Sequence, residues 1–126
     1  MANCYCGSNK ILEECCLKFI NGKSVPLTAE ELMRSRYVAF VLKNKDYLLK
    51  TWFHKKALSS EQLFEDSIQW VSLEILETVK GQATDNSGVV EFKATFEKNG
   101  VKTILHERSE FKKESGLWFY TKGQHK

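Results

Sequence analysis

The spacing of apolar residues changes once along the chain, and each half predicts a different kind of element. From Ala29 to about Leu42 the apolar residues recur every three or four positions, which predicts an amphipathic helix. Thr28 followed by Glu31 is a capping-box pattern, so this helix is expected to begin just after Thr28. The first ordered element of the body is therefore predicted to be helical.

Two shorter helices are expected after it. Residues 44–52 continue the helical spacing with Asp46 as the expected N-cap, and residues 59–70 follow with Ser59 and Gln62 as a second capping-box pattern. The side chains expected to form the buried edge of the last helix are Leu63, Phe64 and Ile68.

Beyond Trp70 apolar and polar residues alternate, which is the period of a β-strand. The expected strands cover residues 71–78, 88–98, 101–113 and 117–122, and the second should bury Val90, Phe92, Ala94 and Phe96. Asn99-Gly100 is a strong signal for a two-residue hairpin turn. Helices followed by an antiparallel meander predict an α+β fold in which helices pack against one face of a curved sheet.

Composition narrows the setting of this fold. The chain has 126 residues, 42% hydrophobic and 28% charged, with a net charge of +3, as expected for one globular domain with a small appendage. No apolar run approaches the ~20 residues of a membrane span, and the N-terminal residues lack the apolar stretch of a signal peptide. These features predict a cytoplasmic protein with reduced thiols.

All four cysteines lie within the first sixteen residues. Two close pairs separated by a short loop match a tetrahedral site of four thiolates, so we predict a Zn²⁺ ion held by these residues, with iron–sulfur ligation as the main rival. Two other interpretations are cysteines buried as small hydrophobic residues and cysteines paired as disulfides, although such near neighbours make strained disulfides. The predicted ligands are Cys4, Cys6, Cys15 and Cys16.

The sequence around the cysteines suggests a separate module. Gly7 suits a tight metal-binding turn, and Ser8 is the expected N-cap of a short helix over residues 9–16. A segment of about twenty residues buries too little apolar surface to fold by itself, so a bound structural metal is expected to stabilise it. We therefore expect a metal module at 1–20, a linker at 21–27, where an Asn-Gly pair, a serine and the only proline fall, and the α+β body at 28–126.

The segment CYCGSNKILEECC resembles the SEC-C motif, a zinc-binding module also found at the C-terminus of the SecA translocase. Asn9 stands where glycine is common in that motif, and Ile11-Leu12 replace its usual aromatic residues. The chain also resembles the YchJ family of bacterial proteins over nearly its whole length. The segments that carry this resemblance are 27–52, 105–111 and 116–123. That resemblance implies a cone-shaped body like nuclear transport factor 2, with three helices against a curved sheet.

Two charged residues fall at positions expected to face the interior of this body. Arg36 lies within the apolar stripe of the first helix, whereas Arg34 is expected to point to solvent. Glu107 shares a strand face with Leu105 and Phe111, so we predict an ion pair between Arg36 and Glu107. This pair would serve the architecture, or it would form the floor of a ligand cavity walled by Tyr37, Trp52, Trp118 and Tyr120.

Two classes of function remain open. The first is a binding module whose zinc site docks a protein or ribosome-associated partner, with nucleic acid the weaker candidate because no dense basic stripe is present. The second is a small-ligand-binding protein or enzyme that uses the cavity of the cone. Of the three histidines, His125 is expected in the C-terminal tail, and His54 and His106 belong to no recognisable catalytic constellation, which favours the binding module.

Overall fold

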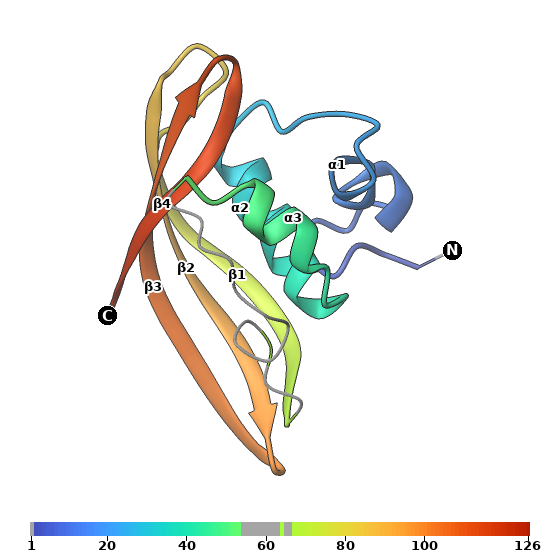
Figure 1. Cartoon of the computed structure of the whole chain (residues 1–126). Coiled ribbons are helices and arrows are strands. Elements are labelled where there is room, and N and C mark those ends of the chain that lie inside the picture. The colour runs from blue at the N-terminus through green and yellow to red at the C-terminus, as the bar shows by residue number, and fades with distance from the viewer. Residues whose placement is uncertain (1, 54–63, 65–66) are drawn as a thin grey trace.

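A four-stranded antiparallel sheet forms one layer of the molecule, and helices cover one of its faces (Figure 1). The structure is a computed structural model, and it describes residues 2–53, 64 and 67–126. The strands follow one another in space in the order β1-β2-β3-β4, as a simple meander does. The elements are η1 (Leu12–Glu14), α1 (Leu17–Ile20), α2 (Ala29–Val41), α3 (Lys45–Lys50), β1 (Ile68–Lys80), β2 (Ser87–Lys98), β3 (Val101–Glu114) and β4 (Leu117–His125).

Helix α2 begins where the capping box predicts. The Thr28 hydroxyl accepts a hydrogen bond from the Glu31 amide at 3.1 Å, and the Glu31 carboxylate accepts one from the Leu27 amide at 2.8 Å. The cap of α3 differs from the prediction, since Asn44 rather than Asp46 accepts the hydrogen bond from the Tyr47 amide. Both side chains suit the role, and the chain turns into the helix two residues earlier than expected.

The prediction of a third helix over residues 59–70 is wrong at its C-terminal end. Residues 59–63, with Leu63, and residues 65–66 lie outside the described part of the chain, but Ile68–Trp70 belong to β1. Trp70 pairs with Phe96 of β2, and their rings lie 5.4 Å apart, edge to face. This cross-strand aromatic contact is available only in the extended conformation, so packing outweighs the local helical pattern.

The remaining strand predictions are confirmed. In β2, Val90, Phe92 and Ala94 are buried against the helices, as their alternation predicts, whereas Phe96 is half-buried. At the turn between β2 and β3, Asn99 and Gly100 both have positive φ, 53° and 81°. Two positive φ values in a two-residue loop twist the hairpin in the direction that its strands need, and asparagine and glycine reach them most easily.

Strand β1 contains two irregularities that its sequence pattern does not reveal. Its register against β2 shifts between Trp70 and Ser72 and again between Ile75 and Glu77. Each shift leaves one extra residue, Val71 or Leu76, that has no partner in the ladder. Both extra side chains are exposed. The bulges thus keep Leu73 and Ile75 directed at the core although the alternation is broken.

Helix α2 forms the centre of the core. Leu32 and Val38 are completely buried, and the same hydrophobic cluster joins the inner faces of β2 and β3 to α2. The start of α2 is fixed by a hydrogen bond from the Ala29 amide to the Gly81 carbonyl at 2.9 Å, at the end of β1. This close approach needs glycine, because a Cβ on Gly81 would lie 2.8 Å from the Ala29 Cβ. Gly88 of β2 packs on the same point, where a Cβ would lie 2.5 Å from the Gly81 Cα.

Candidate functional site

The four cysteine sulfurs converge on one point. All four Sγ atoms lie within 4.8 Å of one another, with Cys6 and Cys15 at 3.7 Å and Cys15 and Cys16 at 3.9 Å. None of the four forms a disulfide. Four sulfurs held about 2.3 Å from one tetrahedral ion are about 3.8 Å apart. The Cys6–Cys15 and Cys15–Cys16 separations match that value, so the cluster has the size and the chemistry to hold a metal ion.

A tight loop positions the first pair of thiols. The Cys4 amide donates to the Lys10 carbonyl at 2.7 Å, and a bridge between Asn3 and Ile11 closes the base of the loop. At its tip Gly7 and Asn9 have φ values of 84° and 65°. Asparagine tolerates this left-handed conformation better than most residues, which explains how Asn9 replaces the glycine common in the SEC-C motif.

The second pair is not delivered by the helix expected over residues 9–16. The chain forms η1, turns at Cys15, and begins α1 at Leu17. Ser8 does not act as the predicted N-cap, because its hydroxyl accepts from the Lys10 amide and lies 3.1 Å from the Cys15 sulfur. A polar contact of this kind restrains the orientation of the cysteine sulfur, as outer-shell groups do at metal sites.

Without a cation the thiols compete for protons. Hydrogen bonds to Cys4 and Cys6 hold the pKa of Cys16 far above its ordinary value. Conversely, hydrogen bonds from Cys16 and Cys4 hold the pKa of Cys6 far below its ordinary value. The cluster therefore shares protons among closely spaced sulfurs, and a divalent cation at its centre would remove the repulsion that keeps these thiols protonated.

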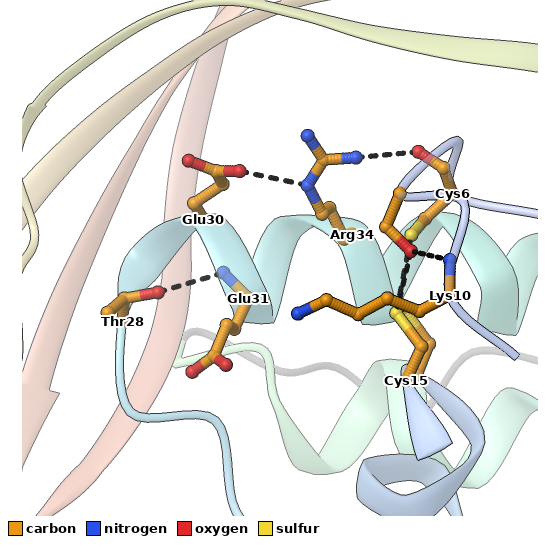
Figure 2. A network of polar contacts seen from close by, with 9 residues as sticks. Cys6, Lys10, Cys15, Thr28, Glu30, Glu31 and Arg34 are labelled. Carbon is orange, nitrogen blue, oxygen red and sulfur yellow. Dashed lines mark hydrogen bonds and ion pairs between the residues drawn. The ribbon is translucent and has the colours of Figure 1, made fainter. Parts of the chain in front are cut away.

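The cysteine module packs directly on the body. Cys4, Cys6 and Cys16 belong to the same hydrophobic cluster as Leu32 and Leu73. Figure 2 shows Arg34 of α2 reaching the module, where its Nη1 donates to the Cys6 carbonyl at 2.7 Å while its Nε pairs with Glu30 at 2.9 Å.

Arg34 was expected to point to solvent, and that expectation is wrong. The helical pattern gives no sign that the cysteine module lies on this side of α2, so it predicts that the Arg34 side chain is surrounded by water. The side chain instead joins helix and module, with Glu30 one turn earlier as its second partner.

A cavity of about 240 Å³ lies between α2 and the sheet. Four of the six predicted cavity residues line it, namely Arg36, Tyr37, Glu107 and Tyr120. Its walls also contain residues that the sequence analysis did not assign to the cavity. Ser109 could have been identified, because it alternates with Glu107 along β3. The other lining residues are Met33, Phe40, Trp70, Phe92, Ala94 and Leu105.

The predicted ion pair between Arg36 and Glu107 is not formed. Arg36 is buried, and its Nη1 donates instead to the Leu48 carbonyl at 2.9 Å and to the Thr51 hydroxyl at 2.7 Å. Glu107 accepts from the Ser109 hydroxyl at 2.7 Å. The two charges thus face one cavity from α2 and β3 without touching, because the end of α3 supplies the partners of the arginine.

The tryptophans lie elsewhere. Trp118 is buried in the main core, where its indole nitrogen donates to the Leu27 carbonyl at 3.1 Å. Trp52 forms a bridge to Tyr120 beside β4 and lines a shallow surface hollow with Phe53 and Phe119. Neither belongs to the walls of the cavity, so the aromatic lining comes from other rings than predicted.

The outer face of the sheet carries a charged network. Glu91 accepts from His106 at 2.7 Å and from Arg108 at 2.9 Å, and Arg108 also pairs with Glu77 at 3.0 Å. His106 is thereby directed away from the cavity, and His54 lies outside the described residues. No helix in the described part of the chain is long and apolar enough to cross a membrane.

Fold and site together define a nuclear transport factor 2-like domain preceded by a SEC-C motif. The family model described as the middle NTF2-like domain of YchJ matches residues 28–123. The chain therefore belongs to the YchJ family, and its relatives in Streptomyces coelicolor and Shewanella sp. are named UPF0225 proteins. The first is 40% identical over 96% of this chain and 94% of its own, and the second 43% identical over 96% and 79%.

Solved structures agree with this assignment. A SEC-C motif containing protein from Rhodopseudomonas palustris matches with a TM-score of 0.88 at 30% identity, over 98% of both chains. A SEC-C motif containing protein from Psychrobacter arcticus matches with a TM-score of 0.81 at 25% identity, over 97% of this chain and 81% of its own. The α+β fold expected from the sequence is thus confirmed, with the cysteine module in front of it.

Proposed function

We propose that Cys4, Cys6, Cys15 and Cys16 hold one Zn²⁺ and that the zinc module is a docking element for a partner protein. The observation that supports the metal most directly is the mutual approach of the four sulfurs. Zinc suits four thiolates, and four protein ligands leave no position open for substrate, so the site is structural rather than catalytic. The proposal includes a cytoplasmic location, where thiols stay reduced.

A charged groove beside the module supports the docking role. It has a volume of about 240 Å³ and lies between the cysteine loop and α2. Its lining carries three cations, Lys10, Lys18 and Arg34, and three carboxylates, Glu14, Glu30 and Glu31. A zinc ion with four thiolates has a net charge of about −2, which the nearby cations offset. A surface with both signs of charge fits a protein segment better than a nucleic acid backbone.

The partner we favour is a protein segment rich in acidic residues, free or on the ribosome. Lys10 is exposed, and Lys18 is half-buried with its ammonium 5.1 Å from the Phe19 ring centre. Neither lysine takes part in an ion pair among the described residues. Both charges are thus available to a partner at the same edge of the module.

Two measurements test the proposal in sequence. Elemental analysis should find one zinc per chain in protein purified without added metal, and Cys15→Ser should lose it. Binding of purified ribosomes, and of a synthetic acidic peptide, is then compared between wild type and the Lys10→Glu, Lys18→Glu double variant. The double variant should retain zinc and lose binding, whereas the distant Lys98→Glu variant should bind as wild type does. Equal binding by wild type and the double variant would contradict the docking role. Wild-type protein without zinc would contradict the metal site.

A further inference from the structure

Arg36 presents unused hydrogen-bond donors to the cavity. Its Nη1 is anchored to Leu48 and Thr51, and its guanidinium lies 4.7 Å from the centre of the Tyr120 ring. Among the described residues no acceptor is bonded to Nε or Nη2, although only 8% of the surface of Arg36 is exposed. These two nitrogens form one edge of the planar guanidinium, and two parallel N–H groups there fit an oxygen acceptor. Burial lowers the pKa of Arg36 to about 10, so the cation persists at neutral pH.

Glu107 presents the complementary acceptor. Its Oε2 is held by the Ser109 hydroxyl, which is itself completely buried, and its Oε1 is 3.8 Å from the exposed His125 ring. Gly123 makes room for this carboxylate, because a Cβ there would lie 2.5 Å from Oε2. The Glu107 carboxylate is therefore preorganised as an acceptor, because a buried hydroxyl holds it and a glycine leaves space for it.

The two charges set the chemistry of an occupant. Arg36 and Glu107 are the only charged residues that line the cavity within the described structure, and no nitrogen–oxygen pair between them lies within 4.0 Å. A carboxylate would satisfy Arg36 but would place a second anion beside Glu107, and an amine would pair with Glu107 but face Arg36. A neutral group with an acceptor and a donor side by side satisfies both.

The walls set the shape. Five aromatic rings, from Tyr37, Phe40, Trp70, Phe92 and Tyr120, line the cavity. The Tyr37 and Trp70 rings are 6.0 Å apart and nearly perpendicular, which offers both a face and an edge to a planar guest. A volume of about 240 Å³ exceeds the roughly 150 Å³ of an apolar cavity that binds benzene, so one ring with a small polar substituent fits.

We propose that this cavity binds a neutral aromatic amide or lactam of about one ring. Its carbonyl oxygen accepts from Nε and Nη2 of Arg36, its N–H donates to Glu107, and its ring lies among the aromatic walls. This binding role is independent of the zinc module, because none of the cysteines lines the cavity.

The test uses three probes with the same ring, namely benzamide, benzoate and benzylamine, titrated into the zinc-loaded full chain. Amide resonances of Ala94 and Leu105 and the indole N–H of Trp70 are followed by two-dimensional NMR. Benzamide should shift these resonances saturably, and the two charged probes should bind about tenfold more weakly because each meets a like charge. Equal or tighter binding of benzoate, or saturation at resonances remote from the cavity, would overturn the proposal.

Two variants separate recognition from simple occupancy. Glu107→Gln keeps the shape and an acceptor oxygen but removes the anion, so benzoate should bind at least about fivefold more tightly while benzamide changes little. Ala94→Leu places a larger side chain in the cavity and should abolish binding, whereas Ala83→Leu at an exposed turn should not. Unchanged benzoate affinity in Glu107→Gln contradicts the proposal, and this result does not depend on whether Ala94→Leu folds.

Discussion

Removing the proposed Zn²⁺ should weaken the whole sheet domain, because the cysteine module contributes to its core. Cys4, Cys6 and Cys16 are 5% exposed or less, and Phe19 of α1 packs with Tyr47 and Leu48. At about 1 kcal/mol for each buried cysteine and about 2 kcal/mol for the phenylalanine, the contact contributes about 5 kcal/mol. Ordering some twenty residues costs about 1–2 kcal/mol each, so this contact alone cannot hold the module in place without a metal.

We therefore expect chelation to lower the free energy of unfolding of the body by about 5 kcal/mol, a large part of the roughly 5–15 kcal/mol typical of a domain. The melting midpoint should fall by about 15 °C or more, since 1 kcal/mol corresponds to about 3–5 °C at this chain length. Thermal melts followed by circular dichroism of the sheet, before and after chelation and after zinc is restored, measure the change. Zinc content is determined in each sample.

Two variants serve as controls. Cys15→Ser should melt like the chelated wild type and should not respond to chelator, because a ligand is missing. Ser24→Ala, at an exposed position of the linker, should respond as wild type does. If the sheet melts at the same temperature after zinc is demonstrably removed, the module is an independent appendage and the reasoning from shared burial is refuted.

Three further predictions concern the body. Leu32→Ala should destabilise the chain by about 2–5 kcal/mol in urea unfolding, because Leu32 is completely buried and its removal leaves a cavity; a loss below about 1 kcal/mol would contradict this packing. Gly88→Ala should cost about 3 kcal/mol or more, since its Cβ meets backbone, whereas Gly100→Ala, with open space but a φ of 81°, should cost about 1 kcal/mol; equal losses would argue against the close approach. Hydrogen bonds from His106 and Arg108 hold the pKa of Glu91 below its ordinary value near 4.5, so its stabilising contribution is present above that pH and is lost as the pH falls through the lower folded value. The stability difference between wild type and Glu91→Gln, measured by urea unfolding across this range, should shrink on acidification, and a constant difference would show that the network contributes nothing.

The alternation of apolar and polar residues predicted the sheet well, because each inward residue of β2 and β3 is buried independently of the others. The alternation of Val90, Phe92 and Ala94 needs no knowledge of distant partners, and the Asn99-Gly100 turn is determined locally. The end of the third predicted helix failed for the opposite reason. Trp70 gains its partner from β2, more than twenty residues further along the chain, and no local pattern carries that information.

The candidate site shows the same division. The thiol spacing sufficed to predict the cluster, because all four cysteines lie within sixteen residues. The partners of Arg36 could not be predicted, since they come from a backbone carbonyl and a threonine at the end of α3. Arg34 was misplaced because its contact depends on where the module docks, which is a tertiary property. Sequence therefore located the charged residues near the interior but not the atoms that they bind.

The edges of the sheet determine how readily another chain could add a strand. Strand β4 is an edge strand, yet the Tyr120 amide donates to the Thr51 carbonyl at 2.8 Å and its carbonyl accepts from the Phe53 amide at 2.9 Å. The segment after α3 thus occupies part of the ladder that β4 would offer to another chain. At the other edge, the two bulges of β1 interrupt the regular row of backbone donors and acceptors. Among the described residues, then, each edge is interrupted, and the exposed Val71 and Leu76 lie at the bulges rather than on a regular edge.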